Sequence, residues 1–264
     1  MRIAFILTRR VPDVPSPVVS SAQKLLAEAG HDVTGWIPED RMLRCDTLGI
    51  EADLYVLKSH TELALSYAGA VETYGVPVFN PYFACLLAQD KVTASCRMRQ
   101  LAVPTPDTWL IDQPMQAEAL LADGPLIIKP HRGHRGAGVY KVLTRQELVA
   151  VPQAKMPLIA QRYVPGCGED LKVYVAGAHV WAVRKKFDDM SFTRPGRPVV
   201  VDDQVREIVA RIRAGFRLEL FGCDVIESPD GPQVVDINYF PGYKGCDDPA
   251  PRIAESIENF AATL

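Results

Sequence analysis

The sequence lacks the features that mark several classes of protein. Its six cysteines, at positions 45, 85, 96, 167, 223 and 246, form no CxxC pair and show no metal-site spacing. The N-terminal stretch MRIAFILTRR does not have the layout of a signal peptide. No apolar run approaches the roughly 20 residues of a membrane span. We therefore expect reduced thiols and a cytoplasmic protein.

The sequence also has little excess charge of either sign. Its 29 Lys and Arg residues against 32 Asp and Glu give a net charge of -3, so we expect no general attraction to nucleic acid or membranes. The 264 residues are 48% hydrophobic, which suits a globular protein of about two domains. The expected partner is a small anionic substrate, and the sequence does not indicate an oligomeric state.

The first part of the chain alternates predicted strands with predicted helices. Apolar runs at 2–8, 31–38, 53–58 and 76–81 indicate strands, and amphipathic stretches at 20–31 and 61–75 indicate helices. This order predicts an α/β domain over 1–84 with a parallel sheet, whose ligands bind beyond the carboxyl ends of the strands. Arg9, Arg10 and Lys58 follow two of these strands and suit an anion, although Lys58 alone is equally consistent with a surface lysine.

A second α+β unit is predicted over 85–164. Helices are expected within 86–101 and 115–123, and strands at 109–112, 126–130 and 158–164. Between the last two strands lies HRGHRGAGV, with Gly133, Gly136 and Gly138, whose backbone N–H groups can cover phosphates. Such a turn is weak evidence alone. Lys129 at the end of the preceding strand strengthens it, as do the charged or ionisable residues His131, Arg132, His134 and Arg135.

The third unit, over 165–264, is predicted to hold two hairpins. The first pairs 170–177 with 179–187, and period two places Asp170 and Lys172 on one face. A loop is expected over 188–203, an amphipathic helix over 204–220 and a closing helix over 251–264.

The second hairpin, over 224–245, turns at Pro229-Asp230-Gly231. Asp236 and Asn238 leave the same face of its returning strand, and Asp224 lies on the partner strand. Two carboxylates and one amide form an oxygen-only set that suits Mg²⁺ and, through it, phosphates. The spacing alone is equally consistent with a solvated hairpin face.

Taken in order, these motifs resemble the ATP-grasp superfamily over essentially the whole chain. The resemblance implies that ATP lies between the two α+β units, that Lys91 and Lys129 contact its phosphates, and that Gln161 with the backbone of Tyr163 and Val164 holds the adenine. The implied ATP set is Lys91, Lys129, Gly133, Gly136, Gly138, Gln161, Arg162, Tyr163, Val164, Asp170 and Lys172. Lys129, Lys172 and Arg135 would be catalytic. Asp224, Asp236 and Asn238 would bind two Mg²⁺ ions, although many members have Glu at the position of Asp236.

Within the superfamily, LKVYVAG (171–177) and DINYFPGY (236–243) resemble the inositol 1,3,4-trisphosphate 5/6-kinase family. The acceptor set implied by this resemblance is Arg9, Arg10, Lys58, His134, Lys185, Gly242 and Lys244. The main hypothesis is therefore a kinase that transfers the γ-phosphate of ATP to a hydroxyl of an inositol phosphate or a similar polyanion. The Gly-rich loop instead resembles that of the glutamate-ligase and D-alanine-ligase branch.

The alternative hypothesis is a carboxylate–amine ligase that works through an acyl phosphate. The ATP and Mg²⁺ residues serve both reactions and cannot discriminate between them. A non-catalytic nucleotide-binding protein is disfavoured, because every expected phosphate and metal position is filled. The identity of the product separates the two enzyme hypotheses.

Overall fold

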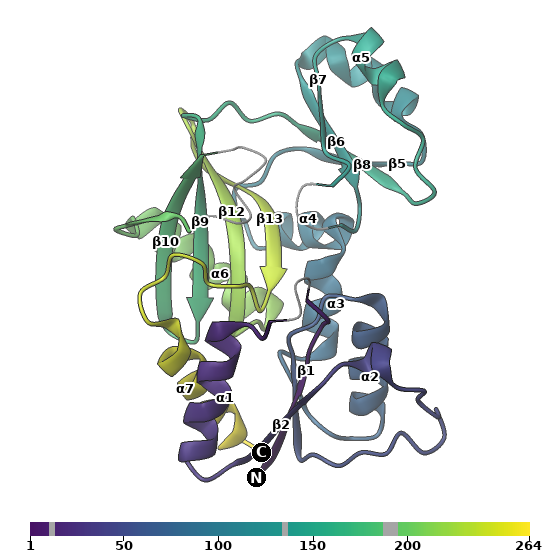
Figure 1. Ribbon diagram of the computed structural model, residues 1–264. Helices are drawn as coiled ribbons and strands as arrows, with labels where there is room; N and C mark the ends of the chain where they lie inside the picture. Colours follow the sequence, from purple (N-terminus) through teal and green to yellow (C-terminus); the bar gives the residue numbers. More distant parts are fainter. Residues whose placement is uncertain (11–13, 134–136, 187–194) are drawn as a thin grey trace.

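The computed structural model describes residues 1–10, 14–133, 137–186 and 195–264, and it contains three sheets (Figure 1). Each sheet falls within one of the three sequence segments 1–84, 85–164 and 165–264. The segment limits themselves stay predictions. The architecture is the mixed α/β arrangement expected from the sequence, with one parallel and two antiparallel sheets.

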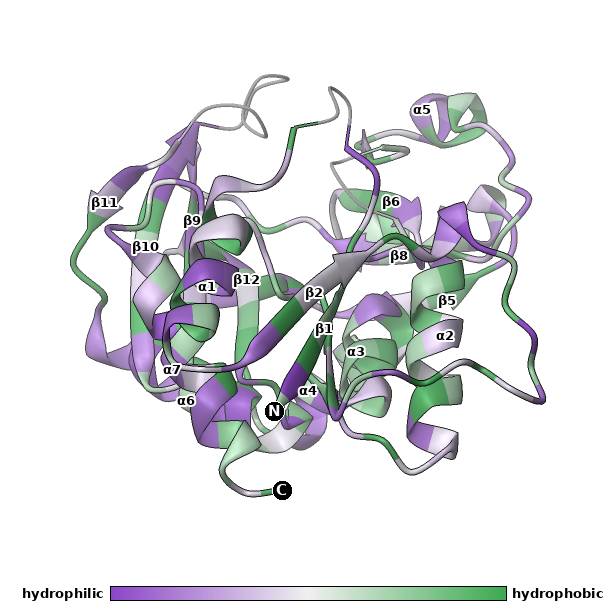
Figure 2. Ribbon diagram, turned by 60° about the horizontal axis from the view of Figure 1, so that its bottom comes forward, coloured by the Kyte–Doolittle hydropathy of each residue, from purple (hydrophilic) through white to green (hydrophobic). Residues whose placement is uncertain are grey.

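The first sheet has the order β2-β1-β3-β4 and is parallel throughout. Its strands are β1 (Arg2–Ile6), β2 (Asp32–Trp36), β3 (Leu54–Leu57) and β4 (Val78–Phe79). The associated helices are α1 (Pro17–Glu28), the 3₁₀ turn η1 (Pro38–Asp40) and α2 (Glu62–Thr73). β3 is buried along its whole length and β1 is buried after its first residue, as expected for central strands of a parallel sheet. Figure 2 shows that β1 is hydrophobic after its polar first residue.

The second sheet is antiparallel, has the order β5-β8-β6-β7 and contains a small core of its own. Its strands are β5 (Thr108–Ile111), β6 (Leu126–Pro130), β7 (Tyr140–Val142) and β8 (Leu158–Arg162). The 3₁₀ helix η2 (Pro114–Asp123) and helix α5 (Arg145–Ala150) pack against it. The helix expected around 115–123 is present and is a 3₁₀ helix.

Two helices, α3 (Tyr82–Gln89) and α4 (Lys91–Gln100), replace the single helix expected within 86–101. The break is at Asp90, whose backbone is extended and whose carboxylate accepts hydrogen bonds from the N–H groups of Val92 and Thr93. Asp90 therefore ends one helix and caps the next. The consequence is that Lys91 becomes the first residue of α4, at the edge of the site described below.

The third sheet has the order β11-β10-β9-β12-β13 and is antiparallel. Its strands are β9 (Glu169–Ala176), β10 (His179–Lys186), β11 (Arg197–Val199), β12 (Leu220–Ser228) and β13 (Gly231–Tyr239). The helices of this part are α6 (Asp203–Phe216) and α7 (Pro249–Ala261). The helix predicted over 204–220 was too long: Arg217 adopts a left-handed conformation, which ends α6, and Leu220 already belongs to β12.

β9 shows why this sheet has two different faces. Leu171, Val173 and Val175 are buried, and they belong to one continuous core with the buried side of α6. Asp170, Lys172 and Tyr174 alternate with them and face the other way. α7 packs against both α1 and β9, which ties the end of the chain to its beginning (Figure 1). Within the described ranges, no helix combines the length and the apolar character needed to cross a membrane.

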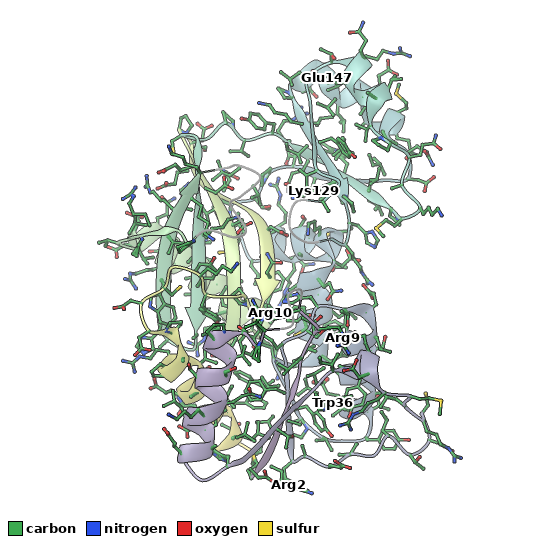
Figure 3. The ribbon with its side chains drawn as sticks, viewed as in Figure 1. Arg2, Arg9, Arg10, Trp36, Lys129 and Glu147 are labelled. Atoms are coloured by element: carbon green, nitrogen blue, oxygen red, sulfur yellow. The ribbon has the colours of Figure 1, made fainter. Side chains whose placement is uncertain are left out.

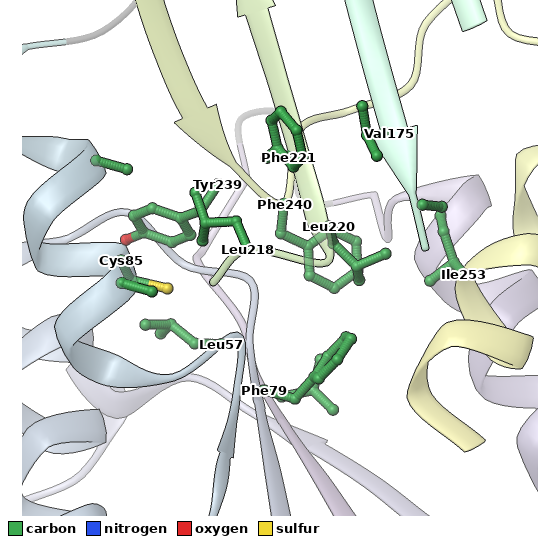
Figure 4. Packing of buried hydrophobic residues seen from close by; sticks show 14 of the residues in the cluster. Leu57, Phe79, Cys85, Val175, Leu218, Leu220, Phe221, Tyr239, Phe240 and Ile253 are labelled. Atoms are coloured by element: carbon green, nitrogen blue, oxygen red, sulfur yellow. The ribbon is translucent and has the colours of Figure 1, made fainter. Parts of the chain in front are cut away.

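The first and third sheets share one hydrophobic core, and Asn80 connects them through hydrogen bonds. Leu57 and Phe79 of the first sheet lie in the same cluster as Phe221 and Phe240 (Figure 4). The fully buried amide of Asn80 donates to the Leu220 carbonyl at 2.8 Å. It accepts from the N–H groups of Glu219 at 2.9 Å and Leu220 at 3.0 Å. This amide fixes the start of β12.

Replacing Asn80 by Ala should destabilise the protein by about 3 kcal/mol, because three backbone groups of the β12 start lose a buried partner. Urea unfolding followed by fluorescence should show a lower midpoint with an unchanged m-value. Gln204→Ala on the exposed side of α6 is the control and should change stability by no more than about 0.5 kcal/mol. An N80A midpoint equal to that of the wild type would contradict this role.

Candidate active site

The polar face of the third sheet carries the acidic residues predicted from the sequence. Asp224 on β12 lies directly opposite Asp236 on β13, and Lys172 on β9 lies opposite Asp224. Residues in register on neighbouring antiparallel strands project to the same face, so these three side chains form one row. Asn238 lies two residues beyond Asp236 and projects from that same face.

Both carboxylates of this row are paired with lysines. Lys172 Nζ is 2.6 Å from Asp224 Oδ2, and Lys91 Nζ, from the start of α4, is 3.1 Å from Asp236 Oδ1. Burial raises the pKa of Asp236, but the nearby Lys91 and Lys129 outweigh it and hold the pKa below its ordinary value. Asp236 is therefore an anion in the folded protein. Burial also raises the pKa of Asp170, whose carboxylate is 3.8 Å from Lys172 Nζ.

A β-bulge next to the acidic row brings in Lys129. The register between β12 and β13 shifts after Asp224, because Asp236 pairs with Asp224 while Val234 pairs with Val225. Val235 is the extra residue and has no partner on β12. Its carbonyl accepts a hydrogen bond from Lys129 Nζ at 3.1 Å. Lys129 is only 7% exposed, and this burial lowers the pKa of its ammonium group. In Figure 3 it extends from the second sheet toward β13.

The residues present fit a Mg²⁺ site that is completed by a substrate. Among the described residues, no cluster of three or more His, Cys, Asp and Glu side chains could hold a metal ion. The donor set here is smaller: two carboxylates in register and one amide. Mg²⁺ is usually bound by one or two carboxylates together with phosphate and water oxygens. Lys91 and Lys172, which now neutralise these acids, are also suitable phosphate ligands.

The Gly-rich loop borders this row on the side of α4. Lys91 Nζ lies 3.3 Å from the Gly133 carbonyl, and Lys91, Gly133 and Asn238 line one small pocket. Gly138 has a positive φ of 73° and packs over Pro130, where a Cβ would come within 3.1 Å of the proline ring. The predicted site residues His134, Arg135 and Gly136 lie outside the described residues.

The residues predicted to hold adenine lie at and just after the end of β8. The Gln161 amide is buried and donates to Thr108 Oγ1 at 3.0 Å, and the Tyr163 N–H donates to the Pro125 carbonyl at 3.0 Å. Val164 follows directly. The guanidinium of Arg162 donates to the Gly124 carbonyl at 2.6 Å, so its side chain is held by the loop before β6.

On the opposite side, the site is bordered by the first sheet. Lys58, directly after β3, donates to the Phe240 carbonyl at 2.7 Å, and its Nζ lies 5.1 Å from the Phe240 ring centre. Burial, with a smaller contribution from Arg10, lowers the pKa of Lys58 from 10.5 to about 8. Arg10 donates to the Val14 carbonyl at 2.7 Å. Arg9 pairs with the exposed Asp40, farther out (Figure 3).

The remaining predicted acceptor residues gather near β10 and the segment 240–246. Lys185 lies opposite Asp170 and is 9% exposed; burial and then Lys172 and Lys244 lower its pKa. Gly242 and Lys244 lie on the segment that follows β13. On this side of the site, the backbone of Gly245 packs closely against Gly196, since a Cβ at Gly245 would come within 2.7 Å of the Gly196 carbonyl oxygen.

Sequence reasoning missed two side chains at the site. His60 stacks on Tyr239 with ring centres 4.1 Å apart and lines the pocket that contains Asn238. Tyr174 lies on the polar face of β9, one alternate position beyond Lys172. The period-two argument that placed Asp170 and Lys172 together extends to Tyr174, so the sequence contained enough information to identify it. His60 had no comparable pattern.

Comparison with known proteins identifies the family. The RimK-like ATP-grasp domain matches residues 86–257. A probable alpha-L-glutamate ligase of Thioalkalivibrio sulfidiphilus is 30% identical over 210 residues, which cover 72% of this chain and 70% of that protein. A protein of Legionella pneumophila with the same name is 28% identical over 214 residues, covering 74% and 71%.

Solved structures share the fold. A RimK domain ATP-grasp protein from Sphaerobacter thermophilus has a TM-score of 0.79 at 18% identity, with 98% of this chain and 100% of that one covered. The D-alanine–D-alanine ligase of Bacillus anthracis has a TM-score of 0.71 at 16% identity and covers both chains completely. The ATP-grasp ligase PsnB was solved with Mg and ADP and has a TM-score of 0.68 at 17% identity, with 97% and 96% covered.

These comparisons overturn the kinase hypothesis, because the curated relatives are named as ligases. The physical reason for the error lies in the segment 236–243. Asp236 and Asn238 are the predicted ligands of Mg²⁺ and ATP, which both reactions use, while Tyr239, Phe240 and Tyr243 are at most 2% exposed and belong to the core. The resemblance of this segment to the inositol phosphate kinases is therefore explained by similar packing and nucleotide chemistry, and it does not indicate the acceptor. The chain belongs to the RimK-like ATP-grasp family.

Proposed function

We propose that this protein is an ATP-dependent carboxylate–amine ligase acting on amino-acid or peptide substrates. The observation that carries the use of ATP and Mg²⁺ is the row of Asp224 and Asp236, paired with Lys172 and Lys91 and flanked by Lys129. This row joins the second and third sheets, where the fold family binds ATP. The names of the curated relatives support ligation as the use made of that ATP.

The reaction takes place in two steps. A carboxylate oxygen of the first substrate attacks the γ-phosphorus, the bond between that phosphorus and the β,γ-bridging oxygen breaks, and ADP leaves. The amine of the second substrate then attacks the carbonyl carbon of the acyl phosphate, inorganic phosphate departs, and the amine proton passes to solvent or phosphate. The products are an amide, ADP and phosphate. Transfer of this kind requires positioning and charge neutralisation above all.

The roles follow from the placement of each residue. Lys91 and Lys129 hold the ATP phosphates, with Gly133 beside them, and Lys172 neutralises charge beside Asp224. Asp224, Asp236 and Asn238 hold two Mg²⁺ ions, which supply charge stabilisation to the phosphates. Gln161, with the backbone of Tyr163 and Val164, borders the adenine. Lys58 and Arg10 attract the acidic substrate from the side of the first sheet.

Asp236→Ala should lower turnover by about a thousandfold or more, because it removes a Mg²⁺ ligand and leaves Lys91 without its carboxylate. Phosphate release under saturating ATP measures the effect. Asp53→Ala is the matched control: Asp53 is paired with Arg2 at the exposed amino end of the central strands β1 and β3, and turnover should stay within twofold of wild type. Wild-type turnover in D236A would refute the metal assignment.

The acceptor kcat/KM should fall as the pH rises through about 8, because Lys58 loses its charge there. The folded pKa lies below 10.5, so the folded state binds fewer protons than the unfolded state between about pH 8 and 10.5, and stability rises with pH across that window. In the Lys58→Met variant, the acceptor kcat/KM should be low and should not fall further as the pH rises through about 8. If kcat/KM of K58M fell at the same pH as that of the wild type, the fall would have to be assigned to another group.

Product identity tests the proposal as a whole. The protein is incubated with Mg²⁺, ATP and a panel of carboxylates and amines, including L-glutamate and short peptides, and ³¹P NMR and mass spectrometry follow the phosphate and the amide. We expect phosphate and a new amide only when both substrates are present. Phosphate bound to a hydroxyl, or ATP consumption that needs no carboxylate, would overturn ligation.

A further inference from the structure

Tyr174 combines a closely packed ring with a hydroxyl group that has no hydrogen-bond partner among the residues that the structure describes. It lies opposite Gly222 on β12, and Gly222 lies opposite Asn238 on β13. Gly222 has no side chain, and the ring of Tyr174 packs close to it. A Cβ at Gly222 would be 3.1 Å from the Val173 carbonyl oxygen and 3.2 Å from both Tyr174 Cδ1 and Pro241 Cγ. The lack of a side chain at position 222 therefore makes room for this ring.

Tyr243 holds the ring from the other side. The two ring centres are 5.7 Å apart, and the Tyr243 hydroxyl donates to the Val175 carbonyl at 2.6 Å. Tyr239 uses its hydroxyl similarly, toward the Ser59 carbonyl at 2.8 Å. Tyr174 differs from both, because within the described part of the chain its hydroxyl makes no hydrogen bond. A fixed donor that has no partner among the described residues, at the edge of a site, suits a substrate atom.

The position of Tyr174 along the sheet indicates which substrate this is. Lys129 of the second sheet contacts Val235, Lys91 contacts Asp236, and Lys58 of the first sheet contacts the Phe240 carbonyl. Read along β13, the contacts therefore pass from the ATP side to the acceptor side. Tyr174 is level with Asn238, between Asp236 and Phe240. Tyr174 therefore lies one alternate position beyond the Asp224–Asp236 row, on the side of Phe240 and its contact with Lys58.

We propose that Tyr174 is a positioning residue whose hydroxyl donates a hydrogen bond to the carboxylate that receives the γ-phosphate. The proposal rests on the ligase function above. One bond from a fixed donor would hold the attacking carboxylate next to the Asp224–Asp236 row, which matters because phosphoryl transfer depends on alignment. Burial, and then the neighbouring Asp224, raise the pKa of the Tyr174 phenol, so the hydroxyl stays a donor at neutral pH.

Tyr174→Phe removes the hydroxyl and keeps the ring. We expect kcat/KM for the carboxylate substrate to fall about ten- to hundredfold, with KM for ATP within twofold of wild type and an unchanged Tm. Tyr74→Phe is the matched control, since its hydroxyl bonds the Cys45 carbonyl on the first sheet's surface. It should leave all three quantities unchanged.

Gly222→Ala tests the position of the ring, because the new methyl group displaces it. We expect G222A to lower kcat/KM for the carboxylate in wild type and to have a smaller effect in the Y174F background. A Y174F enzyme with wild-type kcat/KM for the carboxylate overturns the role of Tyr174. A raised KM for ATP alone also overturns it, in favour of a nucleotide contact. A wild-type enzyme that forms no amide from any carboxylate–amine pair overturns the ligase function itself, and the role of Tyr174 with it.

Discussion

The burial of two carboxylates on one sheet face is the constraint on which the site depends. A partly buried anion is costly unless a counter-ion accompanies it, and here each acid has its own lysine. The two lysines come from different places: Lys172 from the same sheet, Lys91 from the helix that Asp90 starts. The Lys91–Asp236 pair, together with Lys129 on the Val235 carbonyl, therefore connects the ATP-side unit to the third sheet. On binding, Mg²⁺ would take the place of the lysines beside the carboxylates, and phosphate would take the place of the carboxylates beside the lysines.

The segment from Asp236 to Gly245 contributes both to the candidate site and to the core, and the sequence alone cannot separate these two roles. Its polar residues face the site, while Phe240 and Tyr243 fill the core that the first and third sheets share. Lys58 contacts this segment through a main-chain atom, because it donates a hydrogen bond to the Phe240 carbonyl. Similar amino-acid sequences in this segment can therefore occur in proteins with different acceptors, provided that the packing and the ATP chemistry are the same.

Local periodicity predicted the three sheets and much of the site. Alternation along β9 and β13 placed Asp170, Lys172, Asp236 and Asn238 on the polar face. Features that depend on distant partners could not be predicted. The bulge at Val235 is visible only in the pairing of β12 with β13, and the amide of Asn80 is recognisable as a connector only once β12 lies beside it. Tyr174 is the intermediate case: its face was predictable, but its free hydroxyl was not.

The register of β13 separates the two halves of the chemistry. Within this one strand and the residue that follows it, Val235 and Asp236 contact lysines that we assign to ATP, and Phe240 contacts Lys58, which we assign to the acceptor. Because a strand rises about 3.3 Å per residue, these contacts span roughly 15 Å, enough to place a γ-phosphate and a carboxylate in line between them. Under the proposed role of Tyr174, side chains level with Asn238 would change the choice of acceptor while the lysine–aspartate pairs stay in place.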